Sequence, residues 1–279
     1  MIEDSQHERL RLLRALFPEL AARVDSAYEA AAGAGANAGA RLDARLDELA
    51  AQLLPGSHSL AIGDAGVSES FDRALAAAQA ASRLLGVEPP GAEAFAEAGV
   101  DFAALGRAVA DDPSLTPVPA PYGLGPDAWR QAFASGARHR SPELLLAAEA
   151  LGEFGLLDAV PQPAPPIVRT SRTDSGGVRR EARWTLRLVP AGERPPLLGL
   201  AFAHGPHVTL PEMLMLQLMR LEAGEAPVDS ASFTWLAGAL AGGRLAARHV
   251  YDAAEHAIRI TSREVVSQGP HLGARPPVG

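Results

Sequence analysis

The stretch that decides the fold is residues 158–189, DAVPQPAPPIVRTSRTDSGGVRREARWTLRLV. Its first nine residues, 158–166, contain four prolines. Proline fixes the backbone φ angle and removes an amide donor, so this composition predicts a stiff, extended linker. Further along, Trp184, Leu186 and Leu188 alternate with arginine and threonine. A period of two predicts a half-buried strand, and the preceding DSGG predicts the turn of a hairpin formed with IVRTSRT.

The chain before this linker has the spacing of helices. Apolar residues recur every three or four positions, and glycine or proline closes several of the segments. Ser141 followed by Pro142 is a strong helix start, because serine caps the first turn and proline is favoured at the first helical position. The expected helices are residues 6–31, 41–54, 66–86, 100–113, 125–136 and 140–157. We therefore predict an acidic helical domain over residues 1–157.

The chain after the linker, residues 167–279, mixes the two periods. Besides the hairpin, we expect a strand at 196–203 and two strands that flank a turn near residues 252–255. Helices are expected at 210–224 and 230–243, and the C-terminal tail is expected to be extended. The predicted fold class is α+β: an N-terminal all-helical region followed by a mainly antiparallel sheet covered by two helices.

Composition excludes several classes of protein. Hydrophobic residues make up 47% of the 279 residues and charged residues 21%, which is ordinary for a globular protein. No apolar run approaches the roughly 18 residues that a membrane span needs, and MIEDSQHERLRLLRALF has no signal-peptide core. The chain has no cysteine, which excludes disulfides, thiolate metal sites and thiol nucleophiles. We expect a cytoplasmic protein without a membrane contact.

The charge is unevenly distributed. Residues 1–165 hold 12 arginines against 23 acidic residues, whereas the rest of the chain holds 13 against 10. An acidic half repels phosphates, so nucleic acid is a disfavoured partner there. All 25 basic residues are arginine, and the alanine, glycine, proline and arginine usage is typical of a GC-rich bacterial genome.

Common catalytic templates are absent. Without lysine the chain has neither a Walker-type phosphate loop nor a Schiff-base amine. It also has no Gly-x-Ser-x-Gly elbow, and no Gly-x-Gly-x-x-Gly follows a strand. We assign no catalytic residue and expect no cofactor.

The nearest approach to a chemical motif is LLGLAFAHGPHVTLPEM, residues 197–213, with His204 and His207 three positions apart. Zinc sites on helices use histidines four apart, and Gly-Pro prevents a helix here. Glu212 fits a capping box with Thr209, which gives it a structural role. A metal site would need a third ligand, for which the candidates are His249, Asp252, His256 and His271. We favour a turn between a strand and a helix.

Arginine is concentrated in the predicted hairpin. The five residues are Arg169, Arg172, Arg179, Arg180 and Arg183. Guanidinium groups bind phosphates and carboxylates, so this ribbon is a candidate contact for an acidic protein surface, including the acidic half of this chain, or for a nucleic-acid backbone. Charge also protects an edge hairpin from aggregation, which is a purely structural role.

These observations favour a non-enzymatic protein of the bacterial cytoplasm that acts in protein–protein interaction or assembly, as a scaffold or adaptor. The arginine hairpin is the expected contact with a protein partner. Two alternatives stay open: a metal-assisted hydrolase built on the His204/His207 turn, and a nucleic-acid-binding protein that uses the hairpin 169–183.

Overall fold

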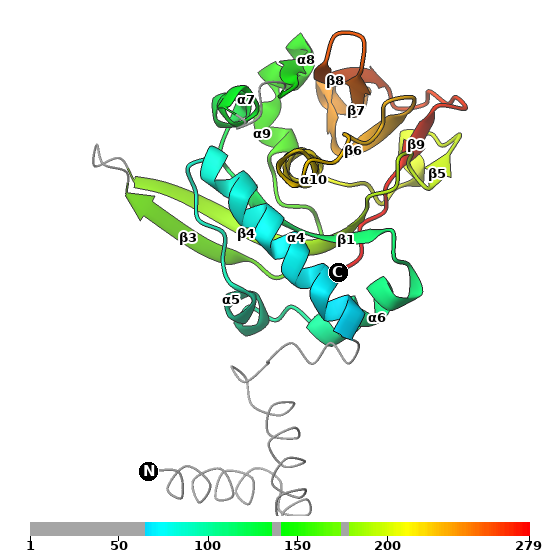
Figure 1. Cartoon of the computed structure of the whole chain (residues 1–279). Coiled ribbons are helices and arrows are strands. Elements are labelled where there is room, and N and C mark those ends of the chain that lie inside the picture. Colours follow the sequence, from blue (N-terminus) through cyan, green and yellow to red (C-terminus); the bar gives the residue numbers. More distant parts are fainter. Residues whose placement is uncertain (1–64, 136–140, 174–178) are drawn as a thin grey trace, which may run out of the picture. The chain divides into compact units, whose positions relative to one another are not determined.

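The computed structural model describes residues 65–135, 141–173 and 179–279 (Figure 1). The helices expected at 6–31 and 41–54 lie outside the described residues. Residues 62–279 belong to one compact unit. No helix of the described part is long and apolar enough to cross a membrane.

Helices and strands are mixed along this unit. The helices are α4 (Ala65–Leu84), α5 (Ala92–Glu97), α6 (Phe102–Asp111), α7 (Pro126–Ser135), α8 (Ala148–Gly152), α9 (Phe154–Leu157) and α10 (Leu210–Ala223), with 3-10 turns η1 (Phe202–His204) and η2 (Ala241–Gly243). The strands are β1 (Leu115–Tyr122), β2 (Glu143–Leu146), β3 (Val168–Thr173), β4 (Arg179–Pro190), β5 (Leu197–Leu198), β6 (Phe233–Leu240), β7 (Leu245–Asp252), β8 (Ala257–Glu264) and β9 (Leu272–Ala274). The α+β class is confirmed.

The smaller sheet has the order β1-β4-β3, and both pairings are antiparallel. The predicted hairpin is confirmed as β3 and β4. Trp184, Leu186 and Leu188 are buried as their alternation predicts. Thr185 and Arg187, on the other face of β4, are buried as well, because this end of β4 also packs beneath α10. This part of β4 is therefore covered on both faces rather than one.

β1 was not expected, since its sequence LTPVPAPY lies in a stretch that we interpreted as a proline-rich connection. Its prolines, at positions 117, 119 and 121, recur with the period of a strand. Proline cannot donate a backbone hydrogen bond, so the amides between the prolines supply the bonds that β1 donates to β4. β1 is an edge strand, where the missing donors face away from the sheet.

The larger sheet has the order β2-β8-β7-β6-β9-β5. The pairs β2–β8 and β6–β9 are parallel, and the remaining pairs are antiparallel. The hairpin of β7 and β8, around the turn at 252–255, is confirmed. Figure 1 shows α10 between the two sheets, and its residues from Leu210 to Met219 are all buried. The methionines of this helix are therefore core residues.

Two predicted helices are wrong, and β1 and β2 show that the described residues up to 157 are not all helical. The segment 140–157 forms β2, α8 and α9, because its leucines pair in parallel with β8. The segment 230–243 forms β6 and η2. Gly238 and Gly242 there have φ angles of 100° and 67°, which a helix excludes. Of the strand expected at 196–203, only β5 forms.

The predicted linker, residues 158–166, connects parts of a single sheet. β1 precedes it in the chain, β3 and β4 follow it, and all three strands belong to the smaller sheet. The linker's first residue, Asp158, is buried, and its carboxylate accepts hydrogen bonds from the amides of Gly123 (2.9 Å) and Gly125 (3.2 Å). These bonds fix the loop that leaves β1.

Candidate functional site

The arginine hairpin consists of β3 and β4. Figure 1 shows the turn end of both strands reaching past α4, α5 and α7. The antiparallel register places Arg169 opposite Arg183 and Arg172 opposite Arg180. The fifth arginine, Arg179, pairs with Thr173. The structure therefore brings all five predicted residues to one two-stranded ribbon.

Arg169 and Arg183 form an exposed pair of like charges. Directly opposed residues in an antiparallel ladder have their Cβ atoms about 5 Å apart, and like charges there repel. Among the described residues, no carboxylate lies within ion-pair distance of either guanidinium. Arg183 acts at longer range on Asp158: burial raises the pKa of that carboxyl, and the guanidinium opposes this effect.

The outer edge of β3 is open in the described part of the chain. β3 is the last strand in the order β1-β4-β3, and its only backbone partner among the described strands is β4. An open edge leaves a row of backbone donors and acceptors that a further extended chain can pair with. The hairpin thus offers both charge and an unfilled strand position.

The His204/His207 turn has a structural explanation. Nε2 of His207 lies 2.6 Å from the carbonyl oxygen of Phe202, and the imidazole stacks on the Phe202 ring with 4.7 Å between centroids. Because a carbonyl only accepts, Nε2 carries the proton. Burial lowers the pKa of His207 and outweighs this bond, so the side chain is neutral at neutral pH. His204 is exposed.

The other proposed metal ligands do not converge on this turn. His249 is buried beneath α10, Asp252 pairs with Arg259, and the phenol of Tyr251 lies 2.8 Å from Nδ1 of His256. Over the described residues, no three His, Cys, Asp or Glu side chains are arranged to hold a metal ion. Thr209 and Glu212 form the predicted capping box at the start of α10, which confirms their structural role.

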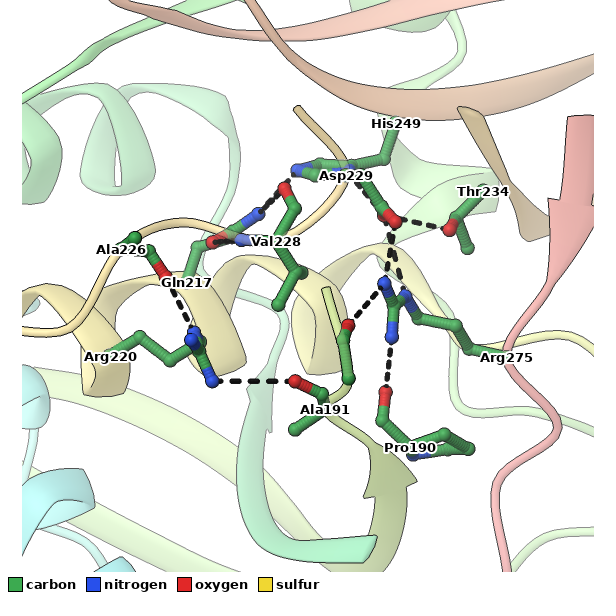
Figure 2. Close-up of polar contacts among 11 residues, drawn as sticks. Pro190, Ala191, Gln217, Arg220, Ala226, Val228, Asp229, Thr234, His249 and Arg275 are labelled. Atoms are coloured by element: carbon green, nitrogen blue, oxygen red, sulfur yellow. Dashed lines mark hydrogen bonds and ion pairs between the residues drawn. The ribbon is translucent and has the colours of Figure 1, made fainter. Parts of the chain in front are cut away.

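Sequence reasoning missed a buried network centred on Asp229 (Figure 2). Its Oδ2 accepts hydrogen bonds from the hydroxyl of Thr234 (2.7 Å) and from Nδ1 of His249 (3.1 Å). Arg275 donates to the same carboxylate from Nη2 (2.6 Å) and Nε (3.4 Å). All four side chains are fully buried. The residues come from β6, β7, the loop before β6 and the segment after β9, so no local sequence motif indicates the network.

The tautomer of His249 follows from its neighbours. The side-chain amide of Gln217 donates to the carbonyl of Val228 (3.0 Å) and accepts from its amide (3.2 Å), which fixes the amide's orientation. Its nitrogen lies 3.0 Å from Nε2 of His249, so Nε2 accepts and Nδ1 carries the proton toward Asp229. An Asp–His pair of this kind occurs in catalytic sites. Here both members are sealed from solvent, and their remaining bonds are to protein.

Arg275 also donates to the carbonyl oxygens of Pro190 (2.6 Å) and Gly192 (2.9 Å). The C-terminal segment is thereby attached to the end of β4. Burial alone would raise the pKa of Asp229, but the hydrogen bond from His249 and the charge of Arg275 hold it below its ordinary value. Asp229 and Arg275 therefore form a buried ion pair to which His249 is hydrogen-bonded, and we interpret the network as structural.

A second buried ion pair lies beneath α10. Arg187 donates to Glu212 from Nε (2.6 Å) and Nη2 (2.7 Å), and the hydroxyls of Tyr122 and Thr209 are 2.9 Å apart beside them. Burial and the charge of Glu212 raise the pKa of the Tyr122 phenol, so it stays protonated.

No protein-family model matches this chain, and comparisons with curated proteins and with solved structures found no significant match.

Proposed function

We propose that this protein is a non-enzymatic interaction or assembly protein that binds an acidic segment of a protein partner through the β3–β4 hairpin. The observation that carries the proposal is the exposed pair Arg169 and Arg183, which has no carboxylate partner in the described part of the chain, at a sheet with an open edge. No cofactor is part of the proposal.

The chemistry of the hairpin fits a carboxylate-bearing partner. Two arginines held opposite each other repel, and an intervening carboxylate relieves that repulsion while it accepts hydrogen bonds from both guanidinium groups. An extended segment that pairs with the edge of β3 places alternate side chains on the face that carries these arginines. Two copies of β3 paired edge to edge would add arginine to arginine, which disfavours self-association through this surface.

The buried Asp229–His249 pair favours a binding role over catalysis. A general base must reach the proton that it removes, whereas Asp229, His249 and Gln217 are fully buried and bonded to one another.

The experiment is a tagged capture from the native organism with R169S/R183S and a matched control, R107S/R194S. Arg107 and Arg194 are exposed and lie away from the hairpin, so both variants lose the same charge. We expect wild type and control to retain an acidic protein in stoichiometric amount and the hairpin variant to lose it. The purified partner must then rebind wild type in a salt-sensitive manner.

Two results would overturn the proposal. One is a partner that binds R169S/R183S as well as it binds the control. The other is retention of RNA or DNA in place of a protein, with an affinity that falls steeply with salt, which would support the nucleic-acid function instead.

A further inference from the structure

A second pair of arginines lies on one face of β7 and β8, beside a small apolar cluster of Trp235, Ala246 and Leu272 on the same face. The register places Arg248 opposite Thr261 and Ala246 opposite Arg263. Arg248 and Arg263 are therefore diagonal neighbours on one face of the sheet, at a distance that long side chains bridge. The opposite face carries His249, which contacts Gln217 of α10, and Ile260, and both are fully buried. Neither arginine belongs to the hairpin of β3 and β4.

Arg248 is held in position by two contacts. Its guanidinium carbon lies 4.0 Å from the centroid of the Phe233 ring, and its Nε donates to the hydroxyl of Thr261 (3.0 Å). The ring and the hydroxyl occupy one face and one edge of the guanidinium. Within the described part of the chain, the terminal Nη1 and Nη2 have no hydrogen-bond partner. The two terminal nitrogens of the Arg248 guanidinium are therefore held in a fixed direction and are available to donate hydrogen bonds.

The charge of this pair is uncompensated within the described residues. Arg259, on the same face, is neutralised by Asp252 and Glu255. No carboxylate of the described residues lies within ion-pair distance of Arg248 or Arg263. Burial lowers the pKa of Arg248, and the positive charge of Arg263 lowers it further.

We propose that Arg248 and Arg263 form a binding site for the phosphate group of a small phosphorylated ligand. A phosphate dianion matches two adjacent cations in charge, and its oxygens accept two parallel hydrogen bonds from one guanidinium fork. Thr261 and Phe233 are positioning residues, because they fix the direction of the Arg248 fork. The site is independent of the proposed hairpin contact, since the two surfaces share no residue.

The test is an NMR titration of the full chain with inorganic phosphate at constant ionic strength, repeated with glycerol phosphate and with acetate. We expect saturable shifts of the amides around Arg248 and Arg263 with both phosphates, and weaker binding of acetate. R248Q/R263Q is expected to bind phosphate at least about tenfold more weakly. T261V is expected to weaken binding less, because it releases the fork without removing its charge. The control R107Q/R194Q is expected to bind like wild type.

If the double variant is unstable, the single variant R263Q is titrated in its place, because Arg263 is exposed. Equal affinity for acetate and phosphate, unchanged binding by R263Q, or an equal loss in R107Q/R194Q would overturn the proposal. Binding of inorganic phosphate but not of glycerol phosphate would exclude a phosphorylated ligand and leave only the free ion.

Discussion

At the scale of single residues, Arg275 is expected to contribute strongly to stability. It is fully buried and donates to Asp229, Pro190 and Gly192. Arg275→Met leaves the carboxylate of Asp229 buried without its cation, which costs about 3–5 kcal/mol. We expect urea denaturation to show this loss, while Arg194→Met, at an exposed arginine, changes the free energy of unfolding by less than about 0.5 kcal/mol. Equal stability of the two variants would show that Asp229 does not need Arg275.

The same carboxylate predicts a dependence of stability on pH. The folded-state pKa of Asp229 lies below its ordinary value of 3.8, so the unfolded chain binds the proton more tightly. The stabilisation is present above that ordinary value and is lost as the pH falls through the lower folded-state pKa. Urea denaturation between about pH 5 and pH 2 measures it. Asp229→Asn is expected to show a shallower loss across this range, and a slope equal to that of wild type would contradict the assignment.

At the scale of elements, α10 depends on its capping box. The Thr209 hydroxyl accepts from the amide of Glu212 (3.3 Å), and the Glu212 carboxylate accepts from the amide of Thr209 (2.9 Å). Thr209→Ala removes the first bond and the contact with Tyr122, at a cost of about 1–2 kcal/mol. Thr209→Ser keeps the hydroxyl and is expected to recover most of the stability in the same denaturation measurement. If serine is no better than alanine, the hydroxyl is not what stabilises the start of the helix.

The pairing of β5 with β9 depends on Gly273. A Cβ atom at this position would lie 2.1 Å from the carbonyl oxygen of Leu197, so the two strands cannot stay at their present distance. We expect Gly273→Ala to separate them and to speed hydrogen exchange at the amide of Gly199, which donates to Leu272 (2.9 Å). Gly269→Ala is the control, because a Cβ there meets nothing within 4 Å. Slow exchange at Gly199 in Gly273→Ala would refute the steric argument.

At the scale of the whole molecule, local patterns predicted the elements better than their assembly. The alternation around Trp184 and the capping box at Thr209 are local signals, and both are confirmed. The strand β6 was missed because its alanines and glycines resemble a small-residue helix, and positive φ angles are not visible in a sequence. The sequence does contain a signal for β1, because prolines spaced two residues apart are compatible with an edge strand.

The candidate sites show the same limit. The arginine hairpin was predictable because its residues are neighbours in sequence, and the register of β3 and β4 brings them to one ribbon. The Asp229 network joins residues that lie far apart in the chain, so only the fold brings them together. Arg248 and Arg263 are close only because β7 and β8 pair in one register.

The C-terminal segment connects the two sheets, and its removal is the last test of the fold. β9 pairs with β5 and β6 in the larger sheet, while Val278 exchanges two hydrogen bonds with Leu188 of the smaller sheet (2.8 and 2.9 Å). Between these points, Arg275 enters the buried network.

A chain that ends at Pro277 loses only the Val278 bonds, a cost of about 1–2 kcal/mol. A chain that ends at Ala274 also loses Arg275, for a further cost of about 3–5 kcal/mol. We expect hydrogen exchange at the amide of Leu188 to rise in both chains. Exchange across β7 is expected to rise only in the shorter chain, because only there does the Asp229 carboxylate beside His249 lose its cation. Equal exchange across β7 in the two chains would mean that Arg275 does not hold the sheets together.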